Sequence, residues 1–204
     1  MENFLSLPED KQKTIRDAAL KLFGENGYKM ASIKNIADEA RISKSMIFHY
    51  FGTKKELYFY LVDYCSKVLT GPLMNIHKDL PIDYFERMKL ATEKQMGLLK
   101  KEPFFMVFLT TMLSEKDTEV AKELQVYRDY ATSFQKDYAF MEVDLSKFKD
   151  DVDPVVVLRM MVWMAEGFSK KISLESEDAC QKYMNEFTET VELLRKNLYK
   201  EEYL

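Results

Sequence analysis

Residues Ser32–Leu57 read SIKNIADEARISKSMIFHYFGTKKEL, and the middle of this stretch carries two different surfaces. At about 100° per residue, residues 44–51 divide on a helical wheel into two arcs that do not overlap. The outer arc holds Lys44, Ser45, Phe48 and His49, and the apolar arc holds Met46, Ile47, Tyr50 and Phe51. We expect the apolar arc to pack into a core. A solvated helix whose outer residues have no role is the alternative, but an exposed Phe48 favours a contact surface.

Short helices with tight connections surround this segment. Ser32 and Ser43 are residue types that cap helix N-termini, and only a very short turn containing Arg41 separates the two helices that they begin. Short helix, tight turn and short helix is the helix-turn-helix layout. The pattern S-x-x-E at residues 6–9 predicts the start of a first helix that ends near Gly27, and T-x-x-E at residues 53–56 predicts the start of a fourth.

The outer residues of the third helix and the first residues of the fourth have side chains that could bind a polyanion. Lysine, serine, histidine and an aromatic ring can contact phosphates, base edges and thymine methyl groups. Lys54 and Lys55 open the fourth helix at the positive end of its dipole, where lysine is unfavourable unless an anion such as a DNA phosphate lies there. Two solvated lysines are the simpler alternative, at a cost of roughly a few tenths of a kcal/mol.

Composition and charge are compatible with this interpretation. The 204 residues are 47% hydrophobic and 31% charged, with six glycines and five prolines, which is typical of a folded and mainly helical protein. Residues 1–55 hold ten Lys or Arg against seven Asp or Glu, whereas the rest of the chain is acidic and the net charge is −4. A basic N-terminal part permits contact with a polyanion, but it is weak evidence by itself.

The same residues resemble the TetR-like transcriptional regulators. The family pattern T-x-x-x-I-A-x-x-A-G-V-S-x-x-x-L-Y-x-Y-F-x-x-K-x-x-L is matched in this chain at Ile36, Ala37, Ala40, Ser43, Tyr50, Phe51, Lys54 or Lys55, and Leu57. The resemblance is specific over about residues 10–60 and rests beyond them on length and helicity. Arg41 stands where the family usually has glycine, and its cation would add a phosphate contact. Phe48 replaces the commoner tyrosine, and Met46 replaces a smaller residue and is expected in the core.

The resemblance implies an all-α fold with two parts. Residues 1–52 would form a three-helix helix-turn-helix DNA-binding domain, and residues 53–204 a helical effector-binding and dimerisation domain. In the family the second helix braces the DNA backbone and the third enters the major groove. The DNA-binding residues that this implies are Ser32, Lys34, Lys44, Ser45, Phe48, His49, Tyr50 and Lys54.

Two C-terminal segments suit packing between subunits. The helix predicted from Pro154 is apolar almost all round and must be buried on several sides. In the last helix apolar residues recur at steps of three and four, which makes a seam suited to another helix. Because the family usually dimerises through its last two helices, we expect an interface that includes Val155, Met184, Phe187, Val191 and Leu194. Packing within one subunit is equally compatible with the pattern.

Methionine is frequent in the C-terminal part, where ten of the thirteen methionines lie at or beyond Met74. Flexible thioethers adapt to apolar guests, although core filling is the commoner role of each one. The candidate effector contacts are Met88, Phe108, Met112, Tyr127, Trp163 and Glu166. Glu166 interrupts an otherwise apolar helix, where it would complement a cationic ligand or lie at the edge of the dimer interface.

The sequence therefore predicts a ligand-responsive transcriptional regulator. We expect a repressor that binds a near-palindromic operator as a homodimer and is released by a small apolar or cationic effector. A helical adaptor without DNA binding is the alternative.

The sequence disfavours an enzyme and a membrane protein. Neither His49 nor His77 stands in a metal-ligand spacing, and glycine-rich phosphate loops and G-x-S-x-G motifs are missing, so no cofactor or metal is expected. No apolar stretch is long enough to cross a bilayer and none resembles a signal peptide, which predicts a cytoplasmic protein without membrane contact.

Overall fold

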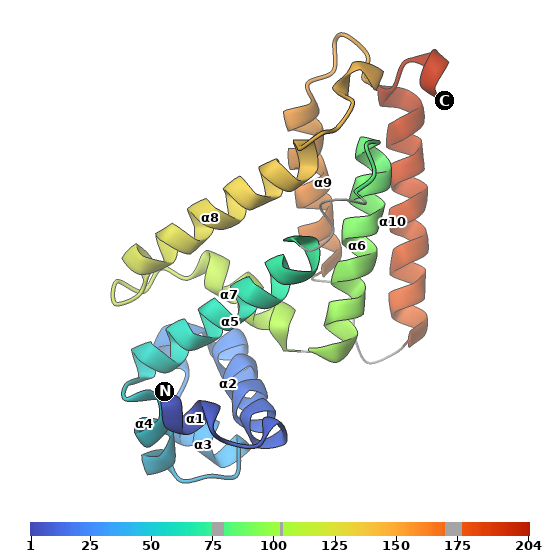
Figure 1. The fold of residues 1–204 in the computed structure, drawn as a ribbon. Coiled ribbons are helices and arrows are strands. Elements are labelled where there is room, and N and C mark those ends of the chain that lie inside the picture. The colour runs from blue at the N-terminus through green and yellow to red at the C-terminus, as the bar shows by residue number, and fades with distance from the viewer. Residues whose placement is uncertain (75–79, 103, 170–176) are drawn as a thin grey trace. The chain divides into compact units, whose positions relative to one another are not determined.

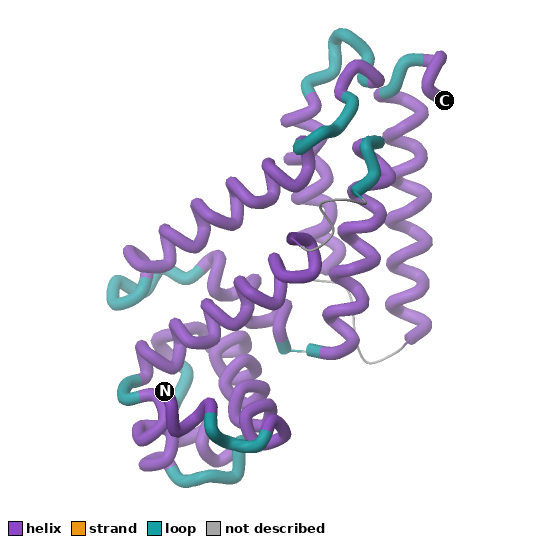
Figure 2. The backbone as a smooth tube through the Cα atoms, in the orientation of Figure 1, coloured by secondary structure: helices purple, strands orange, loops and turns teal. Residues whose placement is uncertain are grey.

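The computed structural model describes residues 1–74, 80–102, 104–169 and 177–204, which are mainly helical (Figure 1). The α-helices are α1 (Glu2–Leu5), α2 (Glu9–Met30), α3 (Ile33–Glu39), α4 (Lys44–Phe51), α5 (Lys54–Met74), α6 (Tyr84–Lys101), α7 (Phe105–Ser114), α8 (Ala121–Phe140), α9 (Pro154–Ser169) and α10 (Glu177–Leu198). The described ranges contain no strand, only an isolated bridge between Phe148 and Tyr199 (Figure 2). The expected all-α fold class is confirmed. None of the described helices is long and apolar enough to cross a membrane.

The chain forms two compact units, each built from two separate stretches. Unit 1 contains residues 1–71 and 102–131, and unit 2 contains residues 72–101 and 132–204. The division falls within α5 and α8. The expected boundary after residue 52, between a DNA-binding and an effector-binding part, does not coincide with the boundaries of these compact units. It stays a prediction about function.

Unit 1 contains α2, α3 and α4, the three helices of the expected helix-turn-helix domain, which we call the head. Within the head, α3 packs against both α2 and α4. Their shared core is apolar and consists of Ile15, Ala19, Phe23, Ile36, Ala37, Ile47 and Phe51. The S-x-x-E box expected at residues 6–9 does not cap α2, because Pro8 is the N-cap residue and Ser6 instead closes α1. Gly27 has a positive φ of 70°, but its ψ of 173° differs from the left-handed helical conformation expected there, and one more helical turn follows it before α2 ends.

In unit 1, α2 also packs closely against α7. A Cβ atom added to Gly24 would lie 2.8 Å from the main-chain nitrogen of Phe108, which is closer than van der Waals contact allows. The loop after α7 is joined to the end of α2 by Glu115, whose Oε2 accepts a hydrogen bond of 2.7 Å from the main-chain N–H of Tyr28. Two segments far apart in the sequence therefore share the hydrophobic core of the head.

Unit 2 contains α10 packed against α6 (Figure 1). One end of this pair is closed by a buried aromatic cluster of Tyr84, Phe85, Phe148 and Tyr199, with ring centroids 5.0–5.8 Å apart. Arg87 is also buried in this unit, where its Nε donates to the carbonyl of Pro81 at 2.9 Å and its guanidinium donates to the carbonyls of Tyr138, in the last turn of α8, and of Met141, directly after α8. The bond to Tyr138 satisfies one of the carbonyl groups at the helix end that have no partner within the helix.

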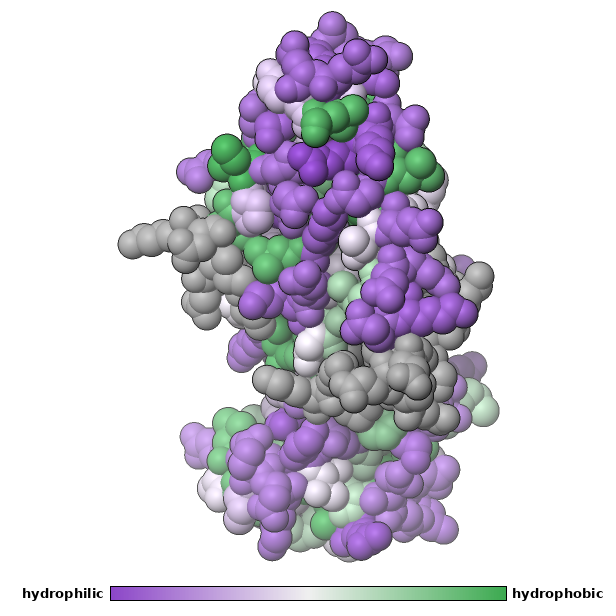
Figure 3. Space-filling model, turned by 90° about the vertical axis from the view of Figure 1, so that its right-hand side faces the viewer, coloured by the Kyte–Doolittle hydropathy of each residue, from purple (hydrophilic) through white to green (hydrophobic). Residues whose placement is uncertain are grey.

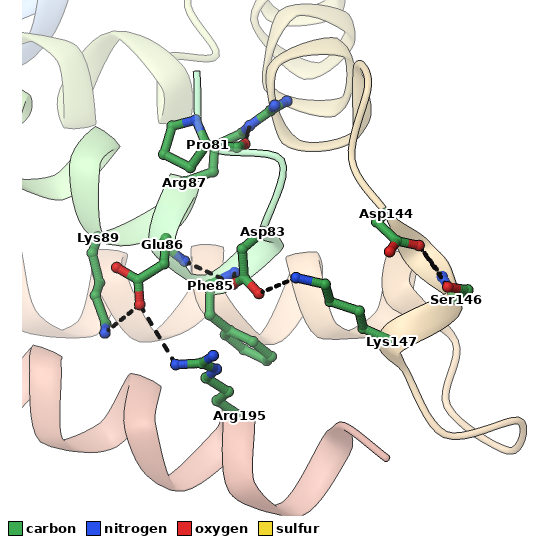
Figure 4. Close-up of polar contacts among 10 residues, drawn as sticks. All are labelled: Pro81, Asp83, Phe85, Glu86, Arg87, Lys89, Asp144, Ser146, Lys147 and Arg195. Carbon is green, nitrogen blue, oxygen red and sulfur yellow. Dashed lines mark hydrogen bonds and ion pairs between the residues drawn. The ribbon is translucent and has the colours of Figure 1, made fainter. Parts of the chain in front are cut away.

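Polar contacts fix the beginning of α6, as Figure 4 shows. Asp83 Oδ1 accepts the main-chain N–H groups of Phe85 and Glu86 at 3.1 and 3.2 Å, and Oδ2 accepts from Lys147 at 2.9 Å. The carboxylate of Glu86 lies between Lys89 at 3.0 Å and Arg195 at 3.7 Å, so α6 and α10 are also joined by charge (Figure 4).

Apolar side chains remain on the surface of both units. On the face drawn in Figure 3 they form small groups separated by hydrophilic side chains. One row lies on α9 in unit 2 and consists of Val155, Val156, Met160 and Trp163, of which Trp163 is 62% exposed. The all-round apolar pattern of this helix predicted burial on several sides, so the single chain leaves part of that pattern uncovered.

Candidate DNA-binding surface

Both ends of α4 are defined by short-range contacts. Ser43 is the N-cap residue, and its Oγ accepts the main-chain N–H of Met46 at 3.3 Å. At the other end Gly52 has a φ of 79°, which a residue with a side chain rarely adopts. A Cβ atom there would also lie 2.6 Å from the carboxylate of Glu56. α4 is therefore limited to the eight residues Lys44–Phe51.

The inner side of α4 is held by aromatic packing, as the helical wheel predicts. Ile47, Tyr50 and Phe51 are buried, and the ring of Phe51 lies 4.7 Å from that of Phe4 and 5.3 Å from that of Tyr60. Tyr50 is only 8% exposed and meets the ring of Phe4 edge-on. Its implied contact with DNA stays a prediction, and its surroundings favour a role in the core.

The outer side of α4 presents the four residues of the other arc. Lys44, Ser45 and His49 are exposed, and Phe48 is 40% exposed. The Lys44 ammonium lies 5.7 Å from the centroid of the Phe48 ring, which gives the two a cation–π contact. The remaining polar groups of this face are hydroxyl and imidazole groups that can donate or accept hydrogen bonds.

The turn between α3 and α4 keeps left-handed geometry although it lacks the usual glycine. Arg41 has a φ of 56°, its N–H donates to the carbonyl of Asp38, and the next N–H, that of Ile42, donates to the carbonyl of Ala37. This pair of bonds is the Schellman arrangement, in which glycine is usual because other residues are strained. Arg41 therefore adopts the geometry in which glycine is usual, and it adds an exposed cation to the turn.

α3 carries the two other expected backbone contacts. Ser32 is its N-cap residue and is half-buried, yet its side chain makes no capping hydrogen bond. Lys34 is exposed one residue inside the helix. Within the described part of the chain, the cations Lys34, Arg41 and Lys44 form no ion pair with an acidic side chain, so their charge is available to a partner.

The two lysines that open α5 have partners within the chain. Lys54 donates to the carbonyl of Lys29 at 3.2 Å and lies 4.8 Å from the centroid of the Tyr28 ring, and burial lowers its pKa. Lys55 pairs with Glu123 at 2.6 Å. These contacts explain both lysines without a phosphate, so the implied DNA contact of Lys54 rests on the resemblance alone.

The T-x-x-E box before α5 forms in a modified way. The N–H of Glu56 donates to Thr53 Oγ1 at 3.1 Å, and the Thr53 hydroxyl donates to the Glu56 carboxylate at 2.7 Å. The carboxylate therefore binds the hydroxyl in place of the main-chain N–H that a capping box uses. The start of α5 is still fixed directly after Gly52.

One residue of this surface, Asn3, was not identified from the sequence, whereas Arg41 was noted both as a departure from the family pattern and as a candidate phosphate contact. The side-chain amide of Asn3 lies 3.0 Å from His49 Nε2. No local pattern in the first residues of the chain indicates this contact, because it joins positions 46 residues apart in the sequence.

The candidate effector residues are divided between the units. In unit 1, Phe108 and Met112 belong to the buried core, and Tyr127 lines an open groove of about 510 Å³ together with Thr53, Lys55, Glu56, Phe59, Glu123 and Val126. In unit 2, Met88 is buried and Trp163 is exposed. The side chain of Glu166 lies outside the described part of the structure. Their role as effector contacts stays a prediction.

The expected dimer residues also differ in their placement. Phe187 and Val191 are buried within one subunit, whereas Met184 and Leu194 are half-buried and Val155 is 43% exposed. This placement favours the intramolecular alternative for the seam of α10, since α10 packs against α6. The apolar row on α9 remains available to a second subunit.

Comparisons with known proteins agree with this geometry. Residues 15–61 match the family described as bacterial regulatory proteins, tetR family. The HTH-type transcriptional repressor Rv3405c of Mycobacterium tuberculosis is 34% identical over 79 residues, which are 39% of this chain and 40% of that protein. The match to this family falls on the helix-turn-helix segment, where the sequence resemblance is specific. The matched part covers less than half of this curated relative.

The fold resemblance extends over the whole chain. A TetR family transcriptional regulator from Chloroflexus aurantiacus superimposes with a TM-score of 0.72 at 18% identity and covers 98% of both chains. AibR, solved in complex with isovaleryl coenzyme A and operator DNA, superimposes with a TM-score of 0.66 at 18% identity over 88% of this chain and 97% of its own. At such identities the likeness concerns the fold alone.

Proposed function

We propose that this protein is a transcriptional regulator, not an enzyme, and that it binds a near-palindromic DNA operator as a homodimer. The observation that carries the proposal is the outer side of α4, where Lys44, Phe48 and His49 are exposed while the opposite side is buried. A recognition helix needs this division, since one side must hold its orientation and the other must reach base edges. A helical adaptor would need no such face. A DNA partner also implies a cytoplasmic protein.

The roles within the surface follow from chemistry. Lys34, Arg41 and Lys44 are exposed cations that would neutralise phosphates, and such contacts position a protein on DNA without reading its sequence. Ser45 and His49 can form hydrogen bonds with base edges in the major groove. Phe48 is suited to contact with a thymine methyl group. Ser32, Tyr50 and Lys54 remain candidates that the resemblance supplies.

A dimer would present two copies of α4 to successive major grooves, about 34 Å apart along the duplex. The row of Val155, Val156, Met160 and Trp163 is the apolar surface that we assign to the contact between subunits. An unpartnered row of this kind on a helix usually marks an interaction site. Apolar side chains at steps of three and four favour a helical partner.

Control by a small molecule is the second part of the proposal. An effector that binds the regulator better in a state with another spacing of its recognition helices lowers DNA affinity by that difference in binding free energy. AibR binds isovaleryl coenzyme A, so acyl coenzyme A thioesters are the first compounds to test, followed by other apolar and cationic molecules. Repression relieved by the effector is the direction that we propose.

DNA binding is tested by gel retardation of random and selected duplexes at several salt concentrations. The wild-type protein should bind with an affinity that falls steeply with salt, since binding releases counterions from the DNA. Lys34→Ala and Lys44→Ala should each weaken binding and reduce the salt slope by about 0.9. Lys67→Ala removes an exposed cation from α5 and is the matched control. Full-length protein that retards no duplex at low salt contradicts the proposal.

A further inference from the structure

The first residues of the chain form a small helix that packs on the recognition helix. α1 lies beside α4 (Figure 1). Phe4 of α1 is fully buried, and its ring centroid lies 4.7–6.1 Å from those of Phe51, Tyr60 and Tyr50. A buried phenylalanine with three aromatic neighbours anchors α1 although the helix has only four residues. The residues next to Phe4 are therefore held at a defined place beside α4.

Further hydrogen bonds support this position. Ser6 Oγ donates to the carbonyl of Asn3 at 2.9 Å, which closes the C-terminal end of α1. Gln12 on α2 donates to the carbonyls of Leu5 and Leu7 at 3.1 and 2.9 Å. α1 is thus held in place by the aromatic contacts of Phe4 and by the hydrogen bonds from Gln12 of α2.

Within this arrangement the side-chain amide nitrogen of Asn3 lies 3.0 Å from Nε2 of His49. In this arrangement the amide nitrogen faces the ring, and because an amide nitrogen can only donate, Nε2 is the acceptor. An imidazole whose Nε2 accepts carries no proton on that nitrogen. The neutral ring therefore has its proton on Nδ1, and the bond to Asn3 selects one of the two neutral tautomers of His49.

The tautomer decides what His49 can recognise. With the proton on Nδ1, the ring presents a donor, which suits the acceptors of guanine, of adenine N7 and of thymine O4 in the major groove. With the proton on Nε2, the ring would present an acceptor at Nδ1, which suits the amino groups of cytosine and adenine. A histidine without a fixed tautomer would discriminate poorly between these base edges.

We propose that Asn3 is a positioning residue that determines operator specificity, because it holds His49 as a donor toward the base edges. This inference rests on the proposed DNA-binding function. It assigns Asn3 no direct contact with DNA. Its effect on recognition passes through the imidazole of His49.

The tautomer can be measured without DNA. The chain has only two histidines, so proton–nitrogen correlation spectra of full-length protein at about pH 8 contain two imidazole ring systems, and His49→Asn identifies the right one. The wild-type protein should show His49 protonated at Nδ1. Asn3→Ala should return the ring to a mixture, and Asn3→Asp, whose carboxylate only accepts, should move the proton to Nε2. A wild-type ring protonated at Nε2 overturns the inference.

The effect on recognition is measured by selecting bound duplexes from a randomised pool. His49→Ala should lose preference at a base pair in each half-site, on the order of tenfold. Asn3→Ala should lose preference at the same base pair, and the double variant should lose little more, since both act through one contact. Glu2→Gln changes an exposed neighbour on α1 and should leave the selected sequence unchanged.

The possible failures can be told apart. If the wild-type protein selects no sequence, the proposed function fails, while the spectra still test the bond between Asn3 and His49. If His49→Ala changes the selected operator and Asn3→Ala does not, the inference is overturned and the proposed function stands. Thermal unfolding of each variant checks that α1 stays folded, since Phe4 is retained in all of them.

Discussion

Thr111 Oγ1 donates a hydrogen bond of 2.7 Å to the main-chain carbonyl of Gly24, so α7 lies directly against α2 within unit 1. Gly24 allows this approach because it has no side chain. The helix-turn-helix domain therefore shares its core with a helix that begins more than fifty residues after α4 ends, as the helix bounds imply. Changes in α7 can reach the head through this contact, since packed elements transmit displacement.

Gly24→Ala should destabilise the protein by about 1–3 kcal/mol, because the new methyl group would meet the backbone of α7. Alanine is the better helix former by up to about 1 kcal/mol, and this gain is smaller than the cost of overpacking. Gly97→Ala is the matched control, since nothing lies within 4 Å of its added methyl group and it should stabilise the protein slightly. Denaturant unfolding measures both. Equal effects of the two variants would contradict the close approach at Gly24.

Arg41→Gly should raise stability while it lowers DNA affinity. Glycine adopts the φ of 56° without strain, which is worth up to about 1 kcal/mol. The variant also removes one cation, which should reduce the salt slope of DNA binding by about 0.9. Arg41→Lys keeps both the charge and the strain and should change little in either measurement. Unfolding curves and salt titrations of gel retardation separate the two effects, and a loss of stability in Arg41→Gly would refute the account of the turn.

Asp83 should make the stability of unit 2 depend on pH in the acidic range. Burial opposes its charge, but hydrogen bonds from Lys147 and from the N–H of Glu86 outweigh burial, so the pKa of Asp83 lies below its usual value. A lowered pKa means that the carboxylate stabilises the fold above the unfolded pKa of about 3.9, and that this stabilisation is lost as the pH falls through the folded pKa.

Asp83→Ala should therefore cost about 1–3 kcal/mol at pH 7, since it removes the cap of α6 and leaves Lys147 without its partner. The difference from the wild-type protein should shrink as the pH is lowered from about 5 to about 3. Asp150→Asn changes a carboxylate that is 93% exposed and should have little effect at either pH. Denaturant unfolding across this range is the measurement. If the difference in unfolding free energy between the wild-type protein and Asp83→Ala grows toward acidic pH, the lowered pKa of Asp83 is contradicted.

The exposed apolar row on α9 should be required for dimerisation. Replacing Met160 and Trp163 together by glutamate places charge on the surface that we assign to the second subunit, so sedimentation should show a monomer and operator affinity should fall sharply. Ile82→Glu changes another exposed apolar residue of unit 2 and should leave the dimer intact. A double variant that remains dimeric would remove α9 from the interface.

Local patterns were sufficient for most of the head. The wheel of residues 44–51 separated exposed from buried side chains correctly except at Met46, which is only half-buried, and Ser43 caps α4 as its residue type predicts. These features depend on neighbours within one or two turns, which a sequence displays directly. The capping box predicted at residues 6–9 was wrong, because Pro8 and not Ser6 occupies the N-cap position of α2.

Periodicity was less informative about partners. The seam of α10 was correctly identified as a packing surface, but Phe187 and Val191 lie inside one subunit, where α10 packs against α6. An apolar row has the same spacing whether its partner belongs to the same chain or to another. The lysines at the start of α5 were ambiguous in the same way, because the sequence does not show whether their partner is DNA or another part of the chain. In the structure Lys55 pairs with Glu123 on α8.

The sequence by itself determined the helical class, the helix-turn-helix and the outward face of α4, because hydrophobic periodicity and capping residues act over a few positions. Only the tertiary structure decided that Asn3 reaches His49, that α7 packs against Gly24, and that Arg41 keeps the geometry of a glycine turn. These contacts join residues far apart in the chain or depend on a backbone angle, and such relationships leave no periodic signal in a single sequence.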